Sequence, residues 1–109
     1  MPYYPVEEKG DGMKESLVEG RLRAKAKAAG GVAHKWVSPG FTGLPDRIVL
    51  LPVPPEDYDV VNKYVKLVET KATNKLPGPR QVFVHQQLRD LGYEVHVPDS
   101  KEDVDAIFA

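Results

Sequence analysis

The alternation of apolar and polar positions predicts a first helix over residues 13 to 29, a stretch without proline and rich in strong helix formers. Its apolar stripe recurs at helical spacing and contains Val18, Leu22, Ala26 and Ala29. The pair Gly30-Gly31 ends the pattern. Glu19 lies at the edge of the stripe, so we expect its carboxylate to face partly inward.

Three short apolar runs follow and predict β-strands over residues 32–37, 46–51 and 63–71. The second and third runs are separated by a proline-rich, acidic stretch at 52–62, which we expect to be a hairpin loop.

A second helix is expected from Pro79, a residue suited to the first helical turn, to about residue 91, before Gly92. Its inward stripe begins at Gln81, which places a polar amide toward the core. A fourth strand at 93–98 and a short helix after Ser100 complete the order helix, strand, strand, strand, helix, strand, helix. This order predicts a mixed α/β (α+β) fold.

Charged residues stand at the ends of two of the predicted strands. Asp46 and Arg47 open the second strand, and Glu69 and Lys71 close the third, where strand alternation points both side chains the same way. If these strands are neighbours, Asp46 stands beside Glu69, and two adjacent carboxylates repel unless a proton or a cation lies between them. A hard, oxygen-preferring ion such as Mg²⁺ suits such a pair. The alternative is a pair of ordinary surface ion pairs, which contribute little to stability.

Length and composition narrow the class of protein. The chain has 109 residues, enough for one domain, and no cysteine, which excludes disulfides and thiolate zinc sites. No apolar stretch approaches the roughly 20 residues that span a bilayer. Residues 1–12 lack the apolar core of a signal peptide and are expected to form a flexible arm. We therefore expect a soluble, cytoplasmic domain over residues 13–109.

The formal net charge of −1 hides an uneven distribution. Residues 14 to 89 contain 13 bases and 7 acids, a balance of +6, whereas both ends of the chain are acidic. A basic middle suits a face that binds a polyanion, and an ordinary mixed surface is an equal alternative. The three histidines show no metal-ligand spacing, and we expect His85 at the surface.

Pro45-Asp46 followed by Glu69-Thr70-Lys71 resembles the signature of the PD-(D/E)xK nucleases, and the element order is similar to the αβββαβ core of that restriction-endonuclease-like superfamily. Within it, the chain resembles the VRR-NUC family, the virus-type replication-repair nucleases. The matching segments are "ESLVEGRL", "KWVSPGFTGLPDRIVL", "VETKA", "GPRQ", "LGYEV" and "PDSKEDV". The match as a whole extends over residues 13 to 108. Within the family, the chain is most similar to the compact standalone phage and bacterial members.

The resemblance implies a role for each matching residue. The implied metal ligands are the carboxylates of Glu19, Asp46 and Glu69 and the main-chain carbonyl of Thr70, and Glu15, one turn from Glu19, is the alternative helix-borne acid. Lys71 is the implied catalytic lysine, and Gln81 is the implied helical glutamine beside the site. The resemblance places Lys35 near the phosphates of DNA. Arg21 and Lys25 on the first helix, together with Arg47, are further candidate DNA contacts, and a solvated helix surface is an equal alternative for Arg21 and Lys25.

The implied activity is a Mg²⁺- or Mn²⁺-dependent, structure-specific DNA endonuclease, with four-way (Holliday) junctions as the expected substrate. The alternatives are a flap, nicking or restriction-like nuclease or, in another class, a non-catalytic DNA-binding module on a nuclease fold. The intact set of Asp46, Glu69 and Lys71 argues against the last. Resolving a four-way junction requires two coordinated cuts, which predicts a homodimer with one site per subunit. We expect the protein to act in a bacterial or phage-infected cell.

Overall fold

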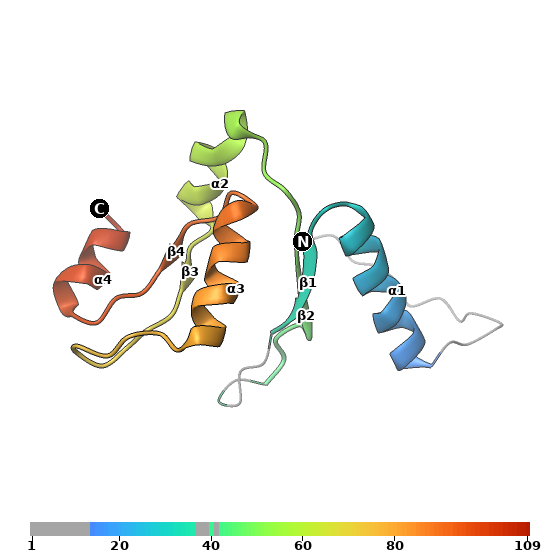
Figure 1. The fold of residues 1–109 in the computed structure, drawn as a ribbon, viewed down its shortest axis with the longest axis horizontal. Coiled ribbons are helices and arrows are strands. Elements are labelled where there is room, and N and C mark those ends of the chain that lie inside the picture. Colours follow the sequence, from blue (N-terminus) through green and yellow to red (C-terminus); the bar gives the residue numbers. More distant parts are fainter. Residues whose placement is uncertain (1–13, 37–39, 41) are drawn as a thin grey trace. The chain divides into compact units, whose positions relative to one another are not determined.

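The computed structural model describes residues 14–36, 40 and 42–109, and the expected flexible arm at 1–12 lies outside this part of the chain. It contains two compact units, residues 1–49 and 50–109. Figure 1 shows the helices and strands in chain order. They bear out the prediction of a mixed α/β fold, with one antiparallel and one parallel pair of strands.

The first unit holds α1 (Glu15–Ala28), β1 (Val32–Lys35) and the start of β2 (Arg47–Leu50). The helix ends where the sequence predicts, because Gly30 adopts a positive φ of 83° and the Gly31 N–H donates to the Ala26 carbonyl oxygen at 2.9 Å. β1 and β2 pair, and the Trp36 N–H donates to the Asp46 carbonyl oxygen at 2.8 Å just beyond their ends. This bond fixes the backbone of Asp46 at the end of the sheet.

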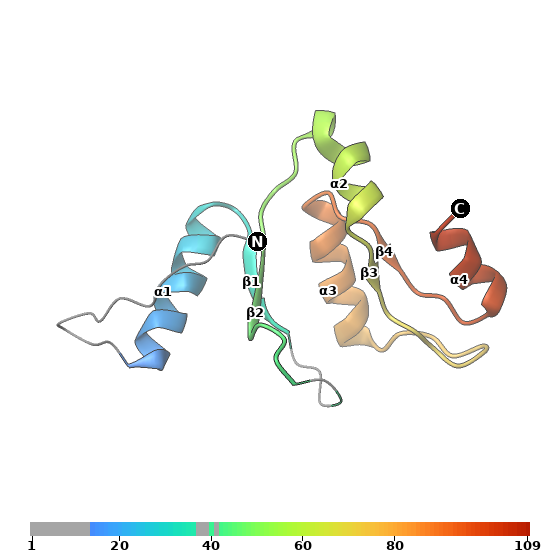
Figure 2. The ribbon, with the colours of Figure 1, turned by 180° about the vertical axis from the view of Figure 1, so that it is seen from behind.

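The second unit is built around a β-α-β segment. Its elements are η1 (Pro55–Asp57), α2 (Tyr58–Tyr64), β3 (Leu67–Val68), α3 (Pro79–Asp90), β4 (Val95–His96) and α4 (Lys101–Ile107). β3 and β4 are parallel, with Leu67 opposite Val95, so they need a crossover connection, which α3 provides. Figures 1 and 2 show α3 alongside this pair of strands from both sides.

The expected hairpin loop at 52–62 is wrong, because residues 55 to 64 are helical. Pro55 occupies the first position of η1, and Glu56, Asp57 and Asp59 lie in the first turns of η1 and α2, where acids favour the positive end of a helix. The helix continues through Tyr64, so the third strand begins later than predicted.

A buried asparagine holds α2 against the rest of the second unit. The side-chain amide of Asn62 donates to the carbonyl oxygens of Tyr58 and Gly92, both at 3.0 Å, and its oxygen accepts the Glu94 N–H at 2.8 Å. Gly92 has a φ of 104°, and a Cβ there would lie 2.6 Å from a ring carbon of Tyr58. Only glycine fits this turn, which confirms the predicted end of α3.

The core of the second unit contains Leu50, Leu88 and Ile107. His85 is also buried, at 8% exposure, so the expectation that it lies at the surface is wrong. It occupies the same face of α3 as Leu88, three residues further on. Among the described residues, no helix is both long and apolar enough to cross a membrane.

Candidate active site

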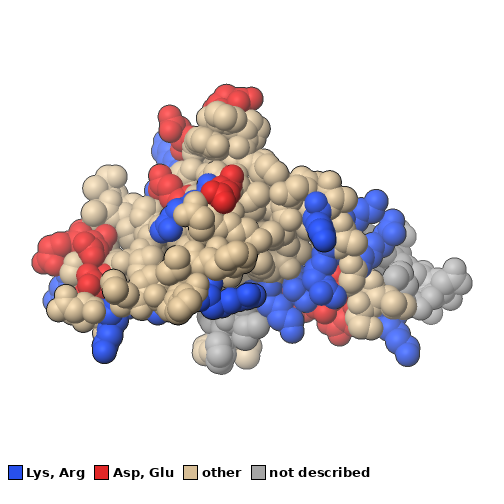
Figure 3. Space-filling view, in the orientation of Figure 1, with Lys and Arg blue, Asp and Glu red and all other residues tan. Residues whose placement is uncertain are grey.

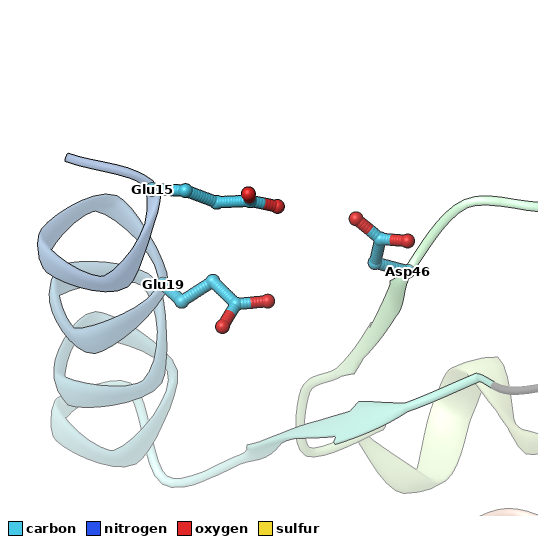
Figure 4. Close-up of side chains that lie close together, drawn as sticks. All are labelled: Glu15, Glu19 and Asp46. Atoms are coloured by element: carbon cyan, nitrogen blue, oxygen red, sulfur yellow. The ribbon is translucent and has the colours of Figure 1, made fainter. Parts of the chain in front are cut away.

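Three carboxylates gather in the first unit: Glu15, Glu19 and Asp46, here called the acidic group. One oxygen from each lies within 4.8 Å of the others. Glu15 and Glu19 are one turn apart on α1 and so share a face of the helix, and Asp46 approaches from the residue before β2 (Figure 4). The structure therefore brings both candidate helix-borne acids, and not one of the two, to Asp46.

Arg47 contacts one member of this group, Glu19. Its Nε lies 3.6 Å from Oε1 of Glu19, and its Nη1 donates to the Ala33 carbonyl oxygen at 3.2 Å. The Arg47 side chain is 14% exposed, and its Nε has no hydrogen-bond partner among the described residues. One guanidinium set against three carboxylates leaves a net negative charge, which a divalent cation would offset.

A second set of side chains gathers in the second unit: Glu69, Lys71 and Gln81, here called the amide-bridged group. The Lys71 ammonium donates to Oε1 of Gln81 at 2.8 Å, and Nε2 of Gln81 donates to Oε1 of Glu69 at 2.6 Å. Lys71 Nζ also lies 3.4 Å from that Glu69 oxygen. The neutral amide thus binds the acid with its donor and the base with its acceptor.

The start of α3 sets the orientation of this amide. Gly78 is the N-cap, Pro79 follows in the first turn, and Gln81 is the third helical residue. Its Oε1 reaches back and accepts the Gly78 N–H at 3.1 Å, as the third residue of a capping box does. With the oxygen turned toward Gly78 and Lys71, the nitrogen faces Glu69. The "GPRQ" segment therefore both begins the helix and directs the glutamine.

The backbone of the third strand positions the other two members. The Glu69 N–H donates to the His96 carbonyl oxygen at 2.9 Å, and the Lys71 N–H donates to the Pro98 carbonyl oxygen at 3.0 Å. These bonds continue the parallel pairing with β4 beyond Val68. Glu69 and Lys71 consequently share one face, as the sequence predicts, while Thr70 between them is exposed.

The predicted site residues thus form two groups, one in each unit, and a metal ion shared by Asp46 and Glu69 stays a prediction. Of the predicted DNA contacts, Arg21 and Lys25 are exposed on α1, and Lys35 is exposed at the end of β1. Arg47 is mostly buried and contacts Glu19, so its structural role is to position that acid. A direct contact of Arg47 with DNA also stays a prediction.

Gly78 is a site residue that the periodic pattern of apolar positions does not indicate. Its N–H donates to Oε1 of Gln81 at 3.1 Å. The signal that could have found it is the glycine-proline pair three residues before a glutamine, which is typical of a helix start in which the glutamine caps the backbone. This arrangement fixes Gln81 as the third residue of the helix.

Comparison with known proteins identifies a related phage protein. No protein-family model and no solved structure matches the chain. The chain is 38% identical over 90 residues to "Putative nuclease p44" of Acyrthosiphon pisum secondary endosymbiont phage 1, an alignment that covers 83% of this chain and 87% of the relative. Identity at this level over most of both chains shows common family membership. The chain therefore belongs to the family of this phage nuclease.

Proposed function

We propose that this protein is a divalent-metal-dependent DNA endonuclease of the VRR-NUC type, which hydrolyses phosphodiester bonds in branched DNA. The observation that carries the proposal is the amide-bridged group, in which Gln81 holds the Lys71 ammonium beside the Glu69 carboxylate. An ammonium held in this way is already oriented to stabilise charge that develops on a phosphoryl group.

The donor atoms fit a hard divalent cation. We propose that Glu19 or Glu15, Asp46, Glu69 and the carbonyl of Thr70 hold the ion. All are oxygen donors, the type that Mg²⁺ and Mn²⁺ prefer, and the acidic group contains no nitrogen or sulfur ligand that would favour zinc. When bound, such an ion activates water and offsets negative charge on the phosphate.

The chain's own residues then have distinct tasks. Lys71 donates hydrogen bonds toward the scissile phosphate, and Gln81 maintains the direction of that ammonium. Arg47 holds Glu19 through its 3.6 Å ion pair and anchors to β1 through the Ala33 carbonyl. A non-catalytic DNA-binding module is disfavoured, because a decayed nuclease would be expected to lose at least one of Asp46, Glu69 and Lys71, and all three are present.

We further propose four-way junctions as the substrate and a homodimer as the active form. Two coordinated cuts across a two-fold symmetric junction need two sites, and a chain of 12.1 kDa offers too little surface for both. The first helix and the segment at 52–61 are the proposed contact regions. A stable interface would bury at least about 1,000 Å² in total.

Labelled linear, flap, fork and four-way DNA, incubated with Mg²⁺, Mn²⁺ or EDTA, test the proposal. We expect metal-dependent cleavage that is fastest on the four-way junction, and light scattering at twice the monomer mass. Preferential cutting of flaps or nicked duplex would replace the substrate assignment. Equal cleavage in EDTA would contradict metal dependence, and a monomer that resolves junctions symmetrically would overturn the dimer.

A further inference from the structure

Residues 72–77 belong to the loop between β3 and α3; they follow Lys71 directly and precede Gly78, the N-cap of α3 (Figure 1). They begin with a tight turn, in which the Lys75 N–H donates to the Ala72 carbonyl oxygen at 2.9 Å. Asn74 occupies the third position of this turn with a φ of 64°, a left-handed conformation that asparagine tolerates better than most residues. The turn is therefore encoded locally.

Asp99 fastens this turn to the start of α4. Its carboxylate accepts the Asn74 N–H at 3.0 Å, and its main-chain carbonyl accepts the Thr73 hydroxyl at 3.0 Å. The Asp99 N–H in turn donates to the carboxylate of Asp103 at 3.3 Å. Asp103 lies within α4, which Ser100 caps by accepting the Asp103 N–H at 3.1 Å. The turn is thus attached on one side to Lys71 and on the other to a capped helix.

The tip beyond this fixed turn presents a cation and a large apolar side chain. Lys75 is exposed, and Leu76 is 86% exposed, so its isobutyl group contributes little to the core. A single exposed leucine is ordinary on a protein surface. This one differs because the turn before it is held by hydrogen bonds and because it stands five residues after the candidate catalytic lysine.

Charge along the loop and the helix after it favours a polyanion. Residues 70 to 89 contain four bases, Lys71, Lys75, Arg80 and Arg89, and no acid. Figure 3 shows acids of this unit gathered instead over α4 and α2. The Asp99 carboxylate contacts the turn but is bound to the Asn74 N–H, so Lys75 and Leu76 lie in a stretch whose own side chains carry no negative charge. An apolar side chain beside a cation suits a nucleic acid, whose bases are apolar on their faces and whose backbone is anionic.

We propose that residues 72–77 form a branch-sensing loop, in which Lys75 binds a backbone phosphate and Leu76 packs against a base exposed at a DNA branch point. This rests on the proposed nuclease function and adds a basis for substrate choice. Apolar side chains such as leucine insert between base steps at the cost of unstacking them, and that cost is smallest where bases are already unpaired or strained. The loop therefore discriminates branched DNA from linear duplex, and Asp99 is its positioning residue.

The test uses the full chain and a four-way junction carrying 2-aminopurine at the branch point, with Ca²⁺ in place of Mg²⁺ to slow cleavage. Binding of the wild type is expected to raise 2-aminopurine fluorescence, because the base becomes unstacked. Leu76→Ala is expected to lose most of this rise in Ca²⁺ and, in a separate assay with Mg²⁺, to cut branched DNA about tenfold more slowly, while its affinity for linear duplex stays unchanged. Leu76→Phe, which keeps an apolar surface, should restore both signals.

Variants at two further positions, Phe108 and Asp99, distinguish a specific role of the loop from a general effect of changing an exposed residue. Phe108→Ala is the matched control, since Phe108 is 82% exposed but follows α4, outside residues 72–77, and it should behave like wild type. Asp99→Ala is expected to reproduce the loss seen with Leu76→Ala, whereas Asp99→Asn retains an oxygen that accepts the Asn74 N–H and should preserve the fluorescence rise.

The outcomes distinguish this inference from the function on which it rests. A wild type that neither binds nor cuts branched DNA would reject the nuclease proposal itself. A wild type that cuts junctions while Leu76→Ala matches it in fluorescence and rate would reject only the loop. A change in mass by light scattering for Leu76→Ala would show instead that Leu76 contacts a second copy of the chain, which would also overturn the inference.

Discussion

The acidic group and the amide-bridged group differ in how they tolerate concentrated charge. In the acidic group, three carboxylates have oxygens within 4.8 Å, and Arg47 is the counter-charge that contacts Glu19. In the amide-bridged group, one carboxylate and one ammonium are balanced, and Gln81 satisfies both. The first arrangement has more negative than positive charge and could hold a cation, whereas the second is balanced within the protein.

This difference indicates a division of labour. Neighbouring carboxylates repel one another, and a divalent ion bound between them would offset that repulsion. A balanced, hydrogen-bonded set is preorganised and orients Lys71 before any ligand binds. Substitutions in the two groups should therefore have distinguishable signatures in activity, metal response and stability.

The largest expected effect comes from removing a carboxylate charge without changing its shape. Asp46→Asn or Glu69→Gln should abolish cleavage to below about 10⁻³ of the wild-type rate, because each removes a proposed metal ligand. Single-turnover cleavage of a labelled junction measures the loss, and circular dichroism checks the fold. Junction cutting by either variant near the wild-type rate would refute the assignment.

Replacement of Lys71 should cause the next largest loss of activity. Lys71→Met keeps the length of the side chain but removes the proposed transition-state charge, so turnover should fall about 10²–10³-fold while metal and DNA binding persist. Calorimetric titration with Mg²⁺ and a DNA-binding assay in Ca²⁺ measure the retained functions. Normal cutting, or an unfolded variant, would show that Lys71 is a surface or structural residue.

The change in the free energy of unfolding on addition of Mg²⁺ should distinguish the acidic group from the amide-bridged group most directly. Mg²⁺ at roughly 100 times its dissociation constant should stabilise the wild type by about 2.7 kcal/mol, because only the folded chain offers the site. Asp46→Asn should lose this gain and, without metal, be at least as stable as wild type, since one repelling charge is gone. Thermal unfolding with and without Mg²⁺ measures both quantities.

Gln81→Ala provides the contrasting case in the same measurement. It removes hydrogen bonds to Glu69, Lys71 and the Gly78 N–H, so stability should fall by about 1–3 kcal/mol in metal-free buffer. If Gln81→Ala were neutral while Asp46→Asn were destabilising, the proposed contrast between the groups would be reversed.

The smallest effect concerns the surface bases. Arg21→Ala, Lys25→Ala and Lys35→Ala remove exposed charges outside both groups. For each phosphate that the variant no longer neutralises, the slope of log affinity against log salt should become shallower by about 0.9, because fewer counterions are released on binding. Titration of binding from low to physiological salt measures this slope. An unchanged slope in the triple variant would place the DNA on another face.

Local signals explain why parts of the fold are predictable. α1 ends before Gly30-Gly31, and α3 begins at Pro79 and ends before Gly92, because these residues impose backbone geometry on their immediate neighbours. The helical segment after Pro54 has equally local signals, a proline at its first position and acids in its first turns. In this segment the high proportion of prolines predicts a loop, so the helix that begins at Pro55 is missed from the sequence.

The sequence by itself determined which residues share a face: Glu15 with Glu19 through helical spacing, and Glu69 with Lys71 through strand alternation. It also determined that an amide at Gln81 points inward. Such inferences need only the period of the element that carries the residues.

Only the tertiary structure decided which atoms meet. It showed that Gln81 binds the acid and the base at once, that Asn62 joins α2 to the turn at Gly92, and that Asp99 holds a loop 25 residues earlier in the chain. Spacing along the chain carries no information about these pairs, because a periodic pattern specifies a face but not the segment that packs against it. The partner is chosen by the packing of distant segments, where most buried polar atoms find a hydrogen bond.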